Sequence, residues 1–134
     1  MPGSFFRYEL VFKEAAGTSR GILNSKTTYF IVIKDGTQTG IGECALFKGL
    51  GADDREDYES TLTWTCNHLH LGEHELLKKL IEFPSIQFGL EQAFLGLQKK
   101  NKYELFPSCF TKEEAVSRLT DLFGWGIRPS CKNK

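Results

Sequence analysis

Glycine at alternate positions of a predicted strand is the feature that most restricts how this chain can fold. Residues 40–51 read GIGECALFKGLG, which places Gly40 and Gly42 on one face of a strand, separated by Ile41. Glycine inside a strand commonly marks a bulge or the close approach of another backbone. The pattern therefore predicts a strand that is either bulged or packed unusually closely on this face.

A loop is predicted where this strand ends. Gly49 and Gly51 follow closely after it, and glycine adopts backbone angles that other residues avoid. We expect a flexible loop with an apolar tip formed by Leu46, Phe47 and Leu50. Such a tip is suited to covering another surface.

Three stretches have the patterns of strands: residues 5–13, 27–34 and 40–46. The first alternates apolar and polar residues, and the second is rich in β-branched and aromatic residues. Asp35 and Gly36 are a strong hairpin signal between the second and third strands. Residues 14–26 are mostly polar or small and are predicted to form a long loop. The expected arrangement is a three-stranded antiparallel meander.

About three helices are predicted after the strands. Asp53 or Asp54 is expected to cap the first, and Gly72 to end it. The second covers residues 75–81, and the third begins at Pro84, which suits a first helical position. The expected buried positions of the first and third helices are Tyr58, Leu62, Cys66 and Leu69, and Ile86, Leu90, Ala93, Phe94 and Leu97. The fold class is therefore α+β.

Composition excludes several classes of function. The chain has 134 residues, 40% of them apolar with 11 Phe, which fits one folded domain. Seventeen basic residues balance 17 acidic ones, so no electrostatic footprint for nucleic acid is present. No apolar run approaches the length of about 20 residues that spans a membrane. Four scattered cysteines without a signal peptide predict free thiols and a cytoplasmic protein.

Two groups of side chains invite a metal or acid–base interpretation. Cys66, His68, His70 and His74 lie close in sequence, but Gly72 interrupts them and no second ligand pair follows. The acidic residues between 53 and 59 are expected at a helix N-terminus for dipole reasons. Glu43, alone on its strand, is expected to face solvent or to pair with a neighbour. We predict no metal site and no catalytic residue in this chain.

Arg20 is the more promising ligand contact. It lies among Thr18, Ser19 and Gly21, and an arginine in such a loop binds carboxylates readily. No nucleophile–base pair, phosphate-binding loop or nucleotide fingerprint accompanies it.

Four segments together resemble the N-terminal capping domain of the enolase superfamily. They are TSRGIL at residues 18–23, GIGECALF at 40–47, DDREDYE at 53–59 and PSIQFGLE at 84–91. The resemblance covers residues 5–112 and is greatest to the o-succinylbenzoate synthase family. It implies a capping domain over residues 1–112.

In that family the capping domain closes over a (β/α) barrel. The barrel of that family carries two lysines, which act as acid and base, and three carboxylates, which hold Mg²⁺. The metal ion stabilises the enediolate that forms before water is lost. The resemblance implies that two capping loops shape the pocket of a small carboxylate substrate, in menaquinone biosynthesis. It assigns substrate contact to six residues: Thr18, Ser19, Arg20, Gly21, Phe47 and Leu50.

The barrel has no counterpart in these 134 residues. The chain is therefore expected to be a truncated lid that is inactive alone, with the missing barrel as its partner. The surface left without a barrel is expected to promote self-association. The alternatives are the cap of a muconate cycloisomerase or dipeptide epimerase relative, and a small stand-alone binding domain that uses Arg20.

Residues 113–134 resemble nothing in the family, and we expect a shift of reading frame near Glu114. One choice of synonymous codons for residues 115–134, read two bases later, encodes SIPINGSVWMG at its start. That peptide resembles the first barrel strand of the family.

Overall fold

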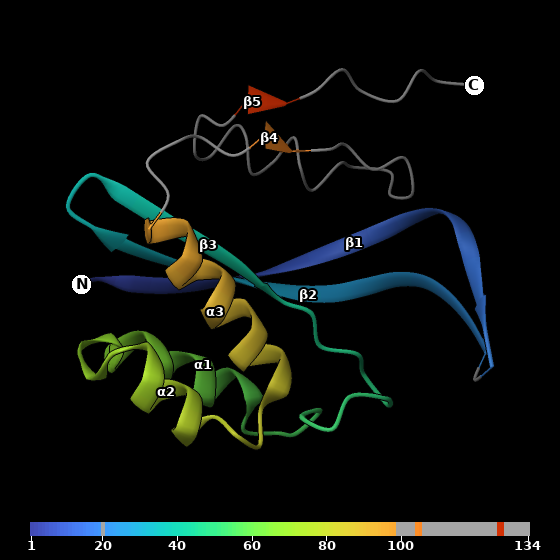
Figure 1. Ribbon diagram of the computed structural model, residues 1–134. Helices are drawn as coiled ribbons and strands as arrows, with labels where there is room; N and C mark the ends of the chain where they lie inside the picture. The colour runs from blue at the N-terminus through green and yellow to red at the C-terminus, as the bar shows by residue number, and fades with distance from the viewer. Residues whose placement is uncertain (20, 99–103, 106–125, 128–134) are drawn as a thin grey trace. The chain divides into compact units, whose positions relative to one another are not determined.

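The computed structural model describes residues 1–19, 21–98, 104–105 and 126–127 (Figure 1). Three strands precede the helices, as the sequence predicts. The elements are β1 (Gly3–Thr18), β2 (Gly21–Asp35), β3 (Gln38–Cys44), α1 (Tyr58–Asn67), the 3₁₀ turn η1 (Leu69–Leu71), α2 (Glu73–Lys79), α3 (Pro84–Gln98), β4 (Glu104–Leu105) and β5 (Gly126–Ile127). None of the described helices is long and apolar enough to cross a membrane.

The first three strands form an antiparallel sheet in the order β1-β2-β3. The β2–β3 register runs from Asp35 opposite Gln38 to Tyr29 opposite Cys44. A two-residue turn joins these strands, and Gly36 takes a φ of 59° in it, which favours glycine. The predicted meander and the α+β class are confirmed.

The chain divides into two compact units. The first contains residues 1–8 and 27–100, and the second contains residues 9–26 and 101–134. In the second unit β1 continues to Thr18 and β2 begins at Gly21, so the predicted loop over residues 14–26 is wrong. Pairing between strands uses backbone groups, and small polar side chains on an exposed hairpin do not prevent it. Gly21, with a φ of 131°, follows the turn.

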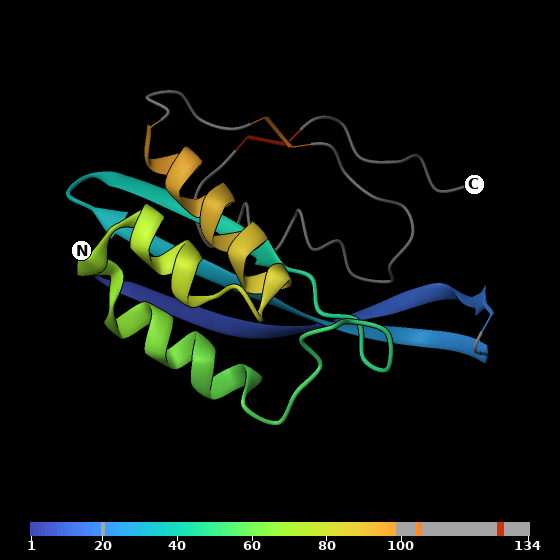
Figure 2. The same ribbon diagram turned by 60° about the horizontal axis from the view of Figure 1, so that its bottom comes forward.

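The core of the first unit lies between the sheet and the helices. Figures 1 and 2 show α1, α2 and α3 on the same face of the sheet. The sheet contributes Tyr29, Ile31, Ile33 and Cys44 to this core. The helices and the turns that flank them contribute Leu62, Leu69, Leu76, Leu80, Ile86, Leu90 and Ala93. The buried face predicted for α3 is confirmed at Ile86, Leu90 and Ala93, while Phe94 and Leu97 are half-buried.

The alternating glycines mark the place where α3 packs on β3. A Cβ at Gly40 would overlap the carbonyl of Ala93, and one at Gly42 would overlap the carbonyl of Gly89. A Cβ at Gly89 would in turn lie 3.0 Å from the carbonyl carbon of Glu43. The helix and strand backbones touch through these glycines, so the close approach is confirmed.

The start of α1 differs from the sequence prediction. The helix begins at Tyr58, with Asp57 at its N-cap, whereas Asp53 or Asp54 had been the predicted cap. The Asp57 carbonyl oxygen accepts hydrogen bonds from Ser60 Oγ (2.9 Å) and Thr61 Oγ1 (2.7 Å). The side chains of Asp53 and Asp54 accept hydrogen bonds from the amides of Ser85 and Gly49 instead, so they do not cap this helix. The third helix begins at Pro84, as predicted.

Candidate functional site

A shallow hollow of about 380 Å³ opens where β3 has ended and α3 begins. Its walls are largely apolar. The lining residues are Ala45, Phe47, Leu50, Gly51, Ala52, Asp53, Pro84 and Ser85. Two residues of the predicted tip line it and remain exposed, Phe47 at 41% and Leu50 at 52%. Leu46 is 5% exposed and belongs to the core, so its assignment to the tip was wrong.

The loop beside the hollow is a closed turn. The carbonyl oxygen of Phe47 accepts hydrogen bonds from the amides of Leu50 (3.2 Å) and Gly51 (2.7 Å). Gly49 has a φ of 76°, which a side chain would strain. Its amide donates to Asp54 Oδ2 at 2.7 Å. The loop therefore directs Phe47 and Leu50 outward while its backbone groups are bonded within it.

Asp53 follows this loop in the chain, and its side chain caps the N-terminus of α3, a helix that is remote in sequence. It is only 2% exposed, and its Oδ2 accepts hydrogen bonds from the Ser85 amide (2.8 Å) and hydroxyl (2.6 Å). Ser85 Oγ is also 2.7 Å from the Tyr58 hydroxyl. Because the Ser85 proton goes to Asp53, the Tyr58 hydroxyl is the donor to Ser85. Burial raises the pKa of Tyr58, which keeps that hydroxyl protonated.

The carboxylate–hydroxyl chain of Asp53, Ser85 and Tyr58 is called the latch below. It joins the loop to the first residues of both α1 and α3. Sequence reasoning missed it because its members are far apart in the chain: 32 residues separate Asp53 from Ser85. The capping rules describe carboxylates next to their own helix, and they give no signal for a remote one.

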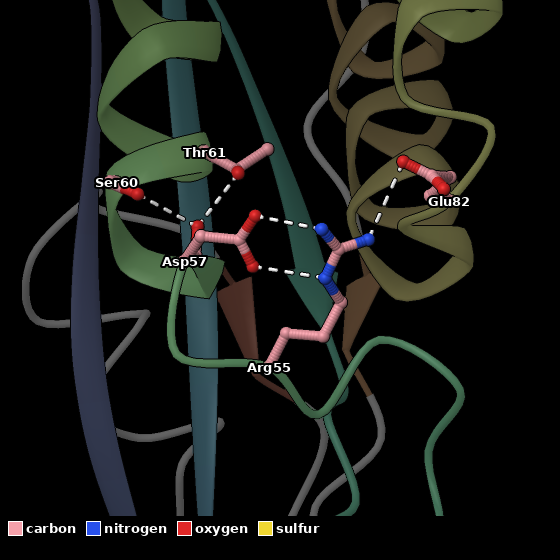
Figure 3. Close-up of polar contacts among 5 residues, drawn as sticks. All are labelled: Arg55, Asp57, Ser60, Thr61 and Glu82. Carbon is pink, nitrogen blue, oxygen red and sulfur yellow. Dashed lines mark hydrogen bonds and ion pairs between the residues drawn. The ribbon is translucent and has the colours of Figure 1, made fainter.

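The acidic residues around the start of α1 have structural partners (Figure 3). Arg55 donates through Nε and Nη2 to the two carboxylate oxygens of Asp57, at 3.0 and 2.9 Å. Its Nη1 lies 3.4 Å from Glu82 Oε2, and its guanidinium lies 4.8 Å from the centre of the Phe83 ring. These groups are exposed, so each ion pair contributes little to stability. The arrangement supports the helix-terminus interpretation of the acidic residues.

Glu43 also forms hydrogen bonds, through both its side chain and its backbone amide. Its Oε1 accepts a hydrogen bond from Thr28 Oγ1 at 2.8 Å, and Thr28 is fully buried. Its amide donates to Gln92 Oε1 on α3 at 3.0 Å. Because β3 is an edge strand of this sheet, the Glu43 amide has no neighbouring strand to pair with, and the Gln92 side chain provides its acceptor instead. Glu43 pairs with a neighbour, one of the two predicted outcomes.

The second predicted ligand loop, around Arg20, belongs to the second unit. Thr18 Oγ1 donates to the carbonyl of Gly21 at 2.7 Å, across the turn. Thr18, Ser19 and Gly21 are all exposed. Arg20 lies outside the described residues. Contact between these four residues and a carboxylate stays a prediction.

The histidines near the end of α1 have aromatic and backbone contacts. The His68 ring stacks on Trp64 at 4.3 Å, and its Nδ1 is 2.7 Å from the Trp64 carbonyl oxygen. Within the described part of the chain, no three Cys, His, Asp or Glu side chains are grouped closely enough to hold a metal ion. Burial raises the pKa of Cys66 to about 11, and it raises that of Cys44 further. Both thiols therefore stay protonated and are poor nucleophiles at neutral pH.

Comparison with known families gives a match over most of the chain. A family model described as "MenC, N-terminal domain" matches residues 3–97. An o-succinylbenzoate synthase of Desulfotalea psychrophila is 30% identical over 154 aligned positions, which cover 92% of this chain and 42% of that relative. The chain thus spans less than half the length of the curated relative that it matches.

Solved structures show the same fold. An o-succinylbenzoate synthase from Thermosynechococcus elongatus, with Mg in its active site, aligns with a TM-score of 0.59 at 22% identity, over 79% of this chain and 35% of that one. MenC from Desulfotalea psychrophila aligns with a TM-score of 0.54 at 23% identity, over 72% of this chain and 34% of that one. A mandelate racemase/muconate lactonizing protein from Herpetosiphon aurantiacus aligns with a TM-score of 0.56 at 19% identity, over 69% of this chain and 28% of that one.

Proposed function

Because the chain belongs to the MenC N-terminal domain family, we propose that it supplies the lid of an o-succinylbenzoate synthase-type enzyme. The match over residues 3–97 is the observation that carries the proposal. The apolar hollow beside Phe47 and Leu50 supports it, because an exposed apolar wall is what a lid needs in order to shield a substrate. The rest of the enzyme is the proposed partner.

The proposed reaction is the loss of water from a cyclohexadiene carboxylate, which yields o-succinylbenzoate for menaquinone biosynthesis. In this reaction the residues of the lid bind the substrate and shield it from water, and they transfer no proton. Phe47 and Leu50 would face the apolar ring of the substrate and exclude water from it. Arg20, with Thr18 and Ser19, would bind a substrate carboxylate through charge-assisted hydrogen bonds.

Mg²⁺ is proposed for the complete enzyme, where it would stabilise negative charge on the substrate. The T. elongatus relative is described with Mg in its active site. The described residues of this chain do not fit the ion, because they bring no three suitable ligands together. We place the ligands in the part of the enzyme that lies beyond the family match.

We propose that residues 1–112 form the lid and that residues 113–134 arise from a shifted reading frame. The family match ends at residue 97, which is compatible with this division. We also place the enzyme in the cytoplasm. The free thiols of Cys44 and Cys66 support that location, because a reducing compartment preserves them.

A chimera tests the proposed function. Residues 3–97 of this chain would replace the matching segment of the D. psychrophila enzyme, and formation of o-succinylbenzoate would be measured with Mg²⁺ present. We expect activity, and Arg20→Ala in the chimera should raise KM more than it changes kcat if Arg20 mainly binds substrate. A folded chimera that turns over only dipeptides or muconate lactones would contradict the proposed reaction and favour another superfamily member.

A stand-alone binding domain is the second candidate, and the closed core of the first unit favours it. Titration of the isolated chain with o-succinylbenzoate separates the two functions. A binding domain would retain affinity alone, whereas a lid without the rest of its pocket should show almost none.

A further inference from the structure

We propose that Asp53 and Asp54 are positioning residues that hold the loop of residues 47–51 in its pocket-wall conformation before any other part of the enzyme contacts it. The inference rests on the proposed function only in treating this loop as a wall of the substrate pocket. It differs from the expectation of a flexible loop. The geometry assigns a separate task to each of the two neighbouring carboxylates.

Asp54 fixes the tip of the loop. Its Oδ2 accepts a hydrogen bond from the Gly49 amide at 2.7 Å, a short distance for a nitrogen donor. Gly49 is the residue with positive φ, so this bond restrains the loop at its most permissive backbone position. The Asp54 amide also donates to the Gly51 carbonyl at 3.2 Å, which closes the segment on itself.

Asp53 fixes the base of the loop. Through the latch it is bonded to Ser85 on α3, and Ser85 is bonded in turn to Tyr58 on α1. A Cβ placed on Gly51 would lie 3.2 Å from Asp53 Oδ1, so the loop backbone rests against this buried carboxylate. The base of the loop therefore cannot shift without exposing or breaking a buried, hydrogen-bonded charge.

These two anchors together determine where the apolar wall lies. The turn between them keeps Phe47 and Leu50 exposed, which is the costly orientation for apolar side chains in water. Without the anchors, the loop would be free to turn these side chains away from solvent. We infer that the wall is prepared in advance, so that closing the enzyme requires little additional ordering of this loop.

The test measures amide hydrogen exchange and the amide chemical shift of Gly49 by NMR in the full 134-residue chain. Asp54→Ala removes the acceptor, Asp54→Asn keeps an acceptor oxygen without the charge, and Glu56→Ala removes a neighbouring exposed carboxylate as a matched control. We expect Gly49 exchange to be about tenfold faster in Asp54→Ala than in the unmutated chain. Asn should restore part of the protection, and the control should change nothing.

Asp53→Asn tests the second anchor in the same spectra, with the amides of α1 and α2 reporting that the fold is intact. We expect faster exchange at Gly51 and Ser85 with protection elsewhere preserved. Unprotected Gly49 in the unmutated chain, or equal exchange in Asp54→Ala, would overturn the inference. Neither result depends on enzymatic activity, so failure here is distinguishable from failure of the chimera.

Discussion

Single glycines allow the strand and helix of this domain to touch. Gly40 and Gly42 on β3 and Gly89 on α3 replace side-chain contact with backbone contact. Their alternation is visible in the sequence, so the close approach could be predicted. The helix that makes this contact could not be predicted, because nothing local in the sequence identifies which later residues a glycine will face.

Gly42→Ala tests this contact. The added methyl would meet the backbone of Gly89, which cannot move away without shifting α3. We expect a loss of about 3 kcal/mol in the free energy of unfolding, measured by urea denaturation. Gly17→Ala is the control, since a Cβ there has open space and should change stability by less than about 0.5 kcal/mol. Equal effects at the two positions would contradict the packing described here.

Tyr29 gives a pH-dependent prediction. Burial, followed by its 2.7 Å hydrogen bond to Glu59, raises the pKa of Tyr29 to about 12. The folded pKa lies above the ordinary value of about 10, so its stabilising contribution is complete below pH 10 and is lost as the pH rises towards 12. Ultraviolet absorbance should show a phenol titrating near pH 12 that disappears in Tyr29→Phe. A full phenolate signal from that residue by pH 10 would contradict the prediction.

At the scale of elements, local sequence patterns predicted most helices and strands but not their remote partners. The start of α3 at Pro84 follows from a local rule, because proline suits the first helical turn. Its cap, Asp53, comes from a loop far earlier in the chain. The hairpin that joins the end of β1 to the start of β2 was missed for a related reason. Strands that are exposed on both faces pair through their backbones and need no alternation of apolar and polar residues.

Asp53→Ala should destabilise α3. The substitution leaves the partly buried Ser85 amide without its acceptor and removes the charge at the N-terminal end of the helix. We expect a loss of about 2 kcal/mol in the free energy of unfolding, measured by chemical denaturation. Asp57→Ala is a useful comparison, because the exposed Asp57 carboxylate pairs only with Arg55 among the residues that the structure describes, and its loss should cost much less. A smaller loss at Asp53 than at Asp57 would contradict the assigned cap.

At the scale of the whole molecule, α3 exposes two large apolar side chains on its outer face. Phe88 is 58% exposed and Leu95 is 54% exposed, and they lie seven positions apart on one helical face. Such positions are suited to an interface rather than to water. Neither residue belongs to the buried face that the sequence predicts for α3, and the structure places both outside the core.

We expect this face to cause self-association of the isolated chain. Sedimentation at increasing concentration should show dimers or larger species, and Phe88→Glu with Leu95→Glu should return the protein to a monomer. Ile81→Glu is the control, because Ile81 is a large apolar residue that is 72% exposed but precedes α3. A monomer at all concentrations would contradict the expectation.

The DNA downstream of the codon for Gln98 tests most directly whether this chain is the first part of a larger catalytic chain. We predict that a reading frame shifted by two bases from residue 115 onward encodes the first barrel strand. It should then continue into the lysines and carboxylates of an o-succinylbenzoate synthase. A single intact frame, with no coding sequence in any frame that resembles the rest of that enzyme, would contradict this prediction.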